Sequence, residues 1–203
     1  MTTQENAFTK RTLVTESELS GSRSAGWWAM LILILNEAVL FGSLIASYFY
    51  IRINSPDWPQ ANIPRPELLL PILMTVILVS SSFFMQWAES SIKHGNARRM
   101  RLALLIAMLL AVIFLLMQVY EYSASEFTPQ SAAYGSLFFG ITGLHGAHVL
   151  IAVLMNLFLQ ARAGLGHFSE RRHLAVENTV LYWHFVDLVW LVVFSSLYLS
   201  PHL

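Results

Sequence analysis

The chain has 203 residues, of which 56% are hydrophobic and 12% charged, whereas a soluble domain carries about 25% charged residues. The net charge is zero and the basic residues are scattered, so nothing indicates nucleic-acid binding. The absence of cysteine excludes disulfides, iron–sulfur clusters, thiolate zinc sites and copper centres built on cysteine sulfur. Composition therefore predicts a membrane protein with little scope for redox chemistry of its own.

Residues 1–25 form a polar N-terminal segment rich in Ser and Thr. This segment has no apolar core followed by a small-residue cleavage site, so it does not resemble a signal peptide. We expect a cytoplasmic segment followed by a first membrane-spanning helix that itself directs insertion.

Five apolar stretches follow, each long enough for the roughly 20 residues that a spanning helix needs. Short polar connections separate them, with four prolines between the first and second stretches and Pro129 before the fourth. The sequence therefore predicts an all-α membrane protein, a five-helix transmembrane bundle that forms one domain over residues 26–200. The predicted spans are residues 26–51, 68–88, 102–122, 133–161 and 176–200.

The basic residues predict the orientation, because Lys and Arg accumulate in short cytoplasmic loops. Ten of the twelve lie in the N-terminal segment and in the second and fourth connections between spans. The opposite side has only Arg52 and Arg65. We therefore expect the N-terminus in the cytoplasm and the C-terminus outside, on the periplasmic side.

Ionisable side chains at bilayer depth cost roughly 2.5–3.5 kcal/mol on insertion scales, so each is a candidate functional group. Two histidines on the fourth span are three residues apart and share a face, and small residues on roughly the opposite face predict a central position for this helix. Three ionisable residues on the fifth span follow one stripe, which should face protein or bound water. The candidates are Glu37, Glu121, His145, His148, Glu177, His184 and Asp187.

Three interpretations of these residues remain open. His145, His148, His184 and Asp187 have the ligand chemistry of a metal site, although two histidines three apart in a helix indicate one only weakly. As structural groups, the same side chains would hydrogen-bond between helices. As functional groups, they would bind a lipid headgroup or carry protons, since histidine titrates near neutrality. Glu37 is the strongest functional candidate, because its own predicted helix offers no opposite charge.

Two other classes of membrane protein compete at this point. A transporter would show internal repeats and helices broken near the midplane, but five spans do not divide into two equal repeats and no proline lies well inside a span. A haem-bearing electron carrier would need axial histidines on facing helices. His145 or His148 opposite His184 meets that need, although nothing marks a haem pocket.

Several segments resemble subunit III of the haem–copper respiratory oxidases. YWHFVDLVW at residues 182–190 resembles the last helix of that family, and YGSLFFGITGLHGAHV at residues 134–149 resembles the penultimate helix with its HGxHV motif. NEAVLFGSLIASYF, which contains Glu37, is similar to the acidic first core helix, and QVYEY at residues 118–122 is similar to the third. The segments occur in the family's order across nearly the whole chain.

The resemblance implies a subunit that holds no haem or copper, with those cofactors in partner subunits. Such a subunit would pack against the catalytic oxidase subunit I and other oxidase subunits, bind phospholipid, and support proton uptake by an enzyme that reduces oxygen to water and pumps protons. At the position of Glu37, family members carry a carboxylate that reacts with hydrophobic carbodiimides and lies beside bound lipid. The resemblance also implies an internal polar cluster of His145, His148, Glu177, His184 and Asp187.

Many members of the family have seven helices, and their two additional N-terminal helices form one wall of a lipid-filled cleft. This chain matches the five-helix bacterial form, which implies a bacterial inner-membrane protein. Within the same fold, an accessory subunit of a nitric oxide reductase is an alternative. A small stand-alone transporter is an alternative from a different class.

Overall fold

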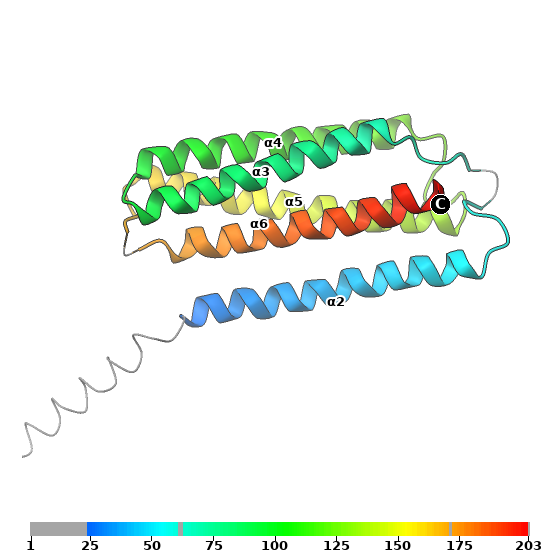
Figure 1. Ribbon diagram of the computed structural model, residues 1–203, viewed down its shortest axis with the longest axis horizontal. Coiled ribbons are helices and arrows are strands. Elements are labelled where there is room, and N and C mark those ends of the chain that lie inside the picture. Colours follow the sequence, from blue (N-terminus) through cyan, green and yellow to red (C-terminus); the bar gives the residue numbers. More distant parts are fainter. Residues whose placement is uncertain (1–23, 61–62, 171, 203) are drawn as a thin grey trace, which may run out of the picture.

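The computed structural model describes residues 24–60, 63–170 and 172–202, and within these ranges the regular structure is helical. Five of the helices are long and apolar enough to cross a membrane, and Figure 1 shows them lying lengthwise beside one another. This confirms the predicted all-α, five-span fold. The elements are α2 (Ala25–Ile53), α3 (Leu69–Lys93), α4 (Ala97–Ala124), α5 (Ala133–Gly164) and α6 (Leu174–Val193), which continues as the π-helix η1 (Phe194–Leu199) and the 3-10 turn η2 (Ser200–His202).

Helices α3 and α4 extend beyond the predicted spans toward each other. Helix α3 continues to Lys93 and α4 begins at Ala97, because helical hydrogen bonding persists after the apolar residues end. Gly95 adopts a φ of 72° in the intervening turn, a conformation that glycine reaches without steric strain. The Asn96 side chain then caps α4 by accepting a hydrogen bond from the backbone N–H of Arg99 at 3.1 Å.

Consecutive helices run in opposite directions, so alternate connections lie at the same end of the bundle (Figure 1). The start of α2, the α3–α4 turn and the α5–α6 connection share one end, and the C-terminus lies at the other. The shared end carries most of the basic residues of the connections, and its cytoplasmic location stays a prediction. The predicted polar segment, residues 1–25, lies outside the described residues except for Ser24, which caps α2, and Ala25.

Helix α6 is the most completely buried span. In its most apolar stretch 56% of the residues are buried, compared with 44% in α5 and 6% in α2. The fourth span, α5, which was expected to be central, contacts α2, α4 and α6 and is second to α6 in burial. Its small-residue face is partly open to the outside, because Ser136, Gly140 and Ala147 are exposed. The bulky Trp183 and Trp190 on α6 fill the interior instead.

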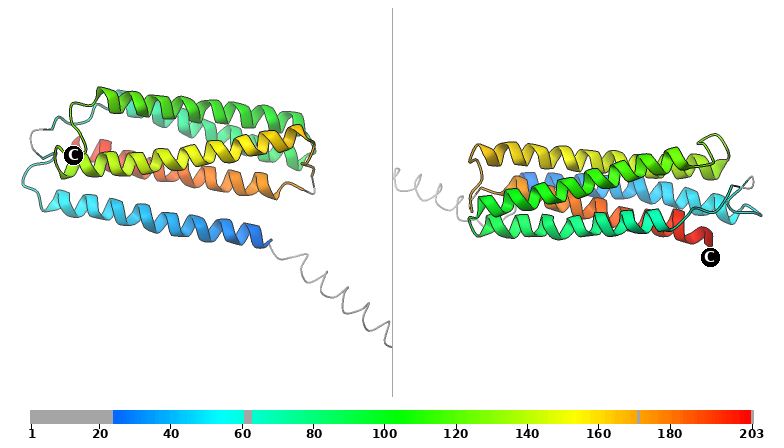
Figure 2. Two further views of the ribbon diagram at one scale, coloured as in Figure 1. Left: turned by 180° about the vertical axis from the view of Figure 1, so that it is seen from behind. Right: turned by 90° about the horizontal axis from the view of Figure 1, so that it is seen from above.

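Helix α2 lies at the edge of the bundle, where it contacts α5 and α6 (Figure 2). Phe41 and Tyr48 are its buried residues. Its C-terminal end is tied to the chain terminus, because the Tyr48 hydroxyl lies 3.2 Å from Ser200 Oγ and Arg52 donates to the Ser200 carbonyl at 2.6 Å. Most of the surface of α2 therefore remains available to lipid or to another chain.

Candidate functional site

Glu37 and His148 form a pair between α2 and α5. Glu37 Oε2 lies 3.1 Å from His148 Nε2, and the Nδ1 of the same ring lies 2.8 Å from the carbonyl oxygen of Leu144. A carbonyl oxygen only accepts, so Nδ1 carries a hydrogen. The contact at Nε2 then needs one further proton, either on Glu37, which donates to a neutral imidazole, or on the ring, which donates to a carboxylate. In both arrangements the pair is neutral overall and holds one proton between its members.

The surroundings of this pair are asymmetric. The His148 side chain is 9% exposed and packs edge-on against Phe41 at a ring distance of 5.1 Å, whereas the Glu37 side chain is 22% exposed. The imidazole is therefore fixed inside the bundle, and the carboxyl group reaches the surface of the bundle beside α2. This is the position at which a group outside the bundle can contact an acid held at membrane depth.

His145, one helical turn earlier, belongs to a different environment. It is completely buried, and its ring centroid lies 5.1 Å from that of Trp190 and 5.8 Å from that of Phe114. Neither ring nitrogen has a hydrogen-bond partner among the described residues. Both rings contact Phe41 of α2, but only His148 reaches Glu37. The described part of the chain contains no group of three or more His, Cys, Asp or Glu residues that could hold a metal ion.

His184 and Asp187 of α6 meet Ser82 of α3. The Ser82 hydroxyl makes a short hydrogen bond with Asp187 Oδ2 and lies 3.0 Å from His184 Nδ1. The other ring nitrogen, Nε2, lies 3.3 Å from Gln86 Oε1. Asp187 is only 5% exposed, whereas His184 is half-buried. These contacts connect the two helices through a polar chain that runs from the surface of the bundle to a buried acid.

Glu177 belongs to a charged cluster at the end of the bundle, and Gln86 joins that cluster to the polar chain by donating to Glu89 Oε2 at 3.5 Å. Lys93 Nζ lies 2.6 Å from Glu89 Oε1 and 3.5 Å from Glu177 Oε1, and His173 Nε2 lies 3.2 Å from the same Glu177 oxygen. The cluster borders an open pocket of about 560 Å³ between the ends of α2, α3 and α6. His184 and Gln86 also line this pocket.

Glu121 lies toward the opposite end of the bundle, where α4 meets the π-helix η1. The hydroxyl of Tyr198 donates to Glu121 Oε2 at 2.8 Å. A π-helical turn is wider than an α-helical one and is common at functional positions. Glu121, Arg65 and Glu126 line a second pocket, of about 360 Å³, beside this contact.

The structure thus distributes six of the seven candidates over four places and leaves the seventh, His145, among aromatic rings. Sequence reasoning missed the residues that complete these places, because it selected only ionisable residues inside a predicted span. Ser82 and Gln86 are not ionisable, and Glu89 and Lys93 lie just beyond the second predicted span. Their spacing of four, three and four residues places them on one helix face, and this signal would have indicated a polar stripe there.

The fold and these sites define a class, that of multi-pass membrane proteins whose internal polar groups are paired between helices. The sequence profile of the family described as cytochrome c oxidase subunit III matches residues 7–201. Cytochrome c oxidase subunit 3 of Thermostichus vulcanus is 34% identical over 171 residues, which cover 84% of this chain and 85% of that protein. The subunit from Loxodonta africana is 36% identical over 84% of this chain and 68% of its own length, and the one from Synechocystis sp. is 35% identical over 85% and 74%.

The chain belongs to the cytochrome c oxidase subunit III family. The predicted resemblance is confirmed, and membership places the chain in a respiratory complex with other oxidase subunits. The motif segments are those that build the sites: NEAVLFGSLIASYF supplies Glu37, the HGxHV segment supplies His145 and His148, and YWHFVDLVW supplies His184 and Asp187.

Proposed function

We propose that this chain is a non-redox subunit of a bacterial haem–copper terminal oxidase in the inner membrane. It packs against the catalytic oxidase subunit I, stabilises that subunit, binds phospholipid beside Glu37 and supports proton uptake. Haem and copper are held by the partner subunits. The observation that carries the proposal is the Glu37–His148 pair, which presents an acid at membrane depth on the loosely covered helix α2.

The physical basis for lipid binding is the combination of a large apolar surface with one polar group. Exposed side chains of α2 include Ile32, Leu35 and Val39, which lie within five residues of Glu37 along the chain. Acyl chains pack against such residues, and the carboxyl group of Glu37 offers a hydrogen-bonding group in a region with no bulk water. The His148 contact keeps that carboxyl group in place.

Purification of the chain from its native membrane in mild detergent tests the proposed complex. We expect a large multi-helix partner, a reduced-minus-oxidised haem spectrum and retained phospholipid in the purified material. Mass spectrometric identification of the accompanying chains provides the readout. A colourless oligomer of this chain alone would contradict the proposal and would favour a stand-alone transporter.

Glu37→Gln is expected to abolish most labelling of this chain by a hydrophobic carbodiimide, because the amide cannot form the acylisourea that a protonated carboxyl forms. Haem content and initial turnover of the complex should stay close to wild type, since haem and copper belong to the partner subunits in this proposal. Labelling is measured by mass spectrometry of the purified complex. Glu177→Gln is the matched control and should leave labelling unchanged, because Glu177 lies in the charged cluster beside Lys93. Undiminished labelling of Glu37→Gln, or loss of haem, would show that the assignment is wrong.

A further inference from the structure

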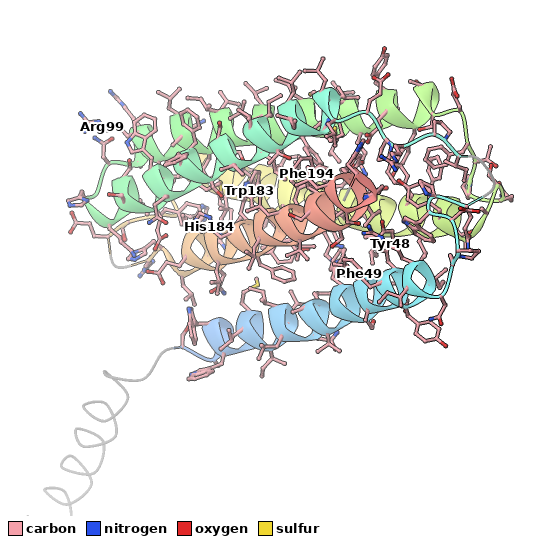
Figure 3. All side chains as sticks on the ribbon, turned by 45° about the vertical axis from the view of Figure 1, so that its right-hand side comes forward. Tyr48, Phe49, Arg99, Trp183, His184 and Phe194 are labelled. Atoms are coloured by element: carbon pink, nitrogen blue, oxygen red, sulfur yellow. The ribbon has the colours of Figure 1, made fainter. Side chains whose placement is uncertain are left out.

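The polar chain of Ser82, His184 and Asp187 connects an open pocket with a buried acid. The pocket, of about 560 Å³, is lined by Gln86, Glu89 and His184 among other residues. His184 lies seven residues, about two helical turns, farther along α6 than Glu177. In Figure 3, His184 lies toward the end of the bundle that carries Arg99, and Tyr48 lies toward the other end. Asp187 lies one turn deeper than His184 and is 5% exposed.

The contacts of Gln86 fix where one proton of His184 must be. Gln86 Nε2 lies 3.5 Å from Glu89 Oε2, an oxygen that accepts, so the amide nitrogen of Gln86 points to Glu89 and its oxygen points to His184. Gln86 Oε1 can only accept. His184 Nε2 therefore carries a hydrogen, and the question that remains is whether Nδ1 carries one as well.

The Ser82 hydroxyl has one hydrogen and two neighbours, Asp187 Oδ2 and His184 Nδ1. It can donate to only one of them, so the other must donate to Ser82 Oγ. In one arrangement, neutral Asp187 donates to Ser82, which donates to Nδ1 of a neutral ring. In the other, imidazolium Nδ1–H donates to Ser82, which donates to the Asp187 carboxylate. The two arrangements contain the same number of protons and differ only by two short proton transfers along the chain.

We propose that Ser82, His184 and Asp187 form a one-proton relay through which the buried Asp187 exchanges its proton with the pocket. The proton leaves Asp187 Oδ2 for Ser82 Oγ, while the hydroxyl proton of Ser82 moves to His184 Nδ1. The imidazolium then releases its Nε2 proton to water in the pocket, which leaves Asp187 as a carboxylate that accepts from Ser82 and leaves the ring neutral with its remaining proton on Nδ1. Uptake follows the same steps in reverse, so one proton is transferred in each direction and no other reactant is needed.

The resting position of the proton follows from burial. Asp187 Oδ1 is buried and has no hydrogen-bond partner in the described part of the chain. A carboxylate with one unpartnered buried oxygen is costly, whereas a neutral carboxylic acid leaves only a carbonyl oxygen unpaired. The proton therefore rests on Asp187.

The other titratable groups on the helices around α6 are engaged with different partners. Glu37 of α2 is paired with His148 of α5, and His145 of α5 lies among Phe114 and Trp190. Lys93 of α3 is held by Glu89 and Glu177. The relay thus shares its pocket with the charged cluster of Lys93, Glu89 and Glu177 but has its own acid, and it does not depend on the function proposed for Glu37.

Infrared spectroscopy of the full chain, purified with its accompanying subunits, tests the relay. The wild-type spectrum minus that of Asp187→Asn should contain a carboxylic-acid C=O band, which shifts when the sample is moved into heavy water. Ser82→Ala should slow that shift by at least about tenfold, since positioned proton-transfer groups contribute roughly 10²–10⁴-fold to the rate. Ser82→Thr retains a hydroxyl and should restore rapid exchange.

Ser80→Ala is the matched control, because the Ser80 hydroxyl donates within its own helix, to the Val76 carbonyl at 2.6 Å. Its exchange rate should equal that of wild type. If Asp187→Asn does not assemble, the band is identified by its frequency change in Ser82→Ala, which removes the hydrogen bond to the acid. The proposal is overturned if no band depends on Asp187 or Ser82, or if Ser82→Ala exchanges as fast as wild type.

Discussion

Replacing Trp190 with alanine is expected to lower the free energy of unfolding by about 3–5 kcal/mol, as is typical when a buried aromatic side chain is removed. Trp190 is completely buried. Its ring centroid lies 4.7 Å from that of Phe114 on α4 and 5.1 Å from that of His145 on α5, and its indole N–H donates to Thr75 Oγ1 of α3 at 2.9 Å. One side chain of α6 therefore contacts three other helices, and its loss leaves a cavity where they meet.

Thermal unfolding of the purified complex in mild detergent measures this effect. Trp190→Phe keeps most of the ring volume and loses the hydrogen bond to Thr75, so its loss of stability should be near 1 kcal/mol. Trp87→Ala is the control for a tryptophan on the surface, since Trp87 is 40% exposed. Equal stability of Trp190→Ala and Trp87→Ala would contradict the central packing role of Trp190.

Gly135→Ala is expected to destabilise the chain by about 1–3 kcal/mol or more, the range seen when a well-packed site receives an extra carbon. A Cβ at Gly135 would lie 2.4 Å from the backbone carbonyl oxygen of Thr128. Backbone cannot move aside as a flexible side chain does, so the start of α5 or the preceding loop must shift. The change should appear as a lower unfolding temperature of the complex.

Gly140→Ala, on the same helix, supplies the matched comparison. A Cβ there meets no heavy atom within 4 Å. Alanine is favoured over glycine inside a helix by about 0.8–1.0 kcal/mol, so this variant should be neutral or slightly stabilised. If both variants behaved alike, the close approach at Gly135 could not be the cause of the effect.

The sequence predicted the five-span fold because a membrane span depends mainly on the hydrophobicity of its own residues. A spanning helix satisfies its backbone hydrogen bonds internally and needs only a long apolar stretch. The structure differs from the prediction at the ends of two helices. Helix α3 continues to Lys93 and α4 begins at Ala97, although several residues beyond the predicted spans are polar. Helical hydrogen bonding and the turn at Gly95 determine those ends.

The candidate site was only partly predictable. Ionisable residues inside spans identified Glu37, His148 and Asp187, because charge at membrane depth is costly whatever surrounds it. Their partners were not predictable from spacing. Ser82 escaped notice, since a serine in a span satisfies itself by bonding to its own helix, as Ser80 does. Only the approach of α3 to α6 gives Ser82 its contacts with His184 and Asp187.

The sequence by itself determined the five spans, the family and which side chains carry polar chemistry into the membrane. The tertiary structure decided which of those side chains meet. It paired Glu37 with His148, joined Asp187 to His184 through Ser82, and left His145 without a hydrogen-bond partner among the described residues although it shares a helix face with His148. The physical reason is that apolar content acts within each helix, whereas hydrogen-bond partners depend on how the helices rotate and pack against one another.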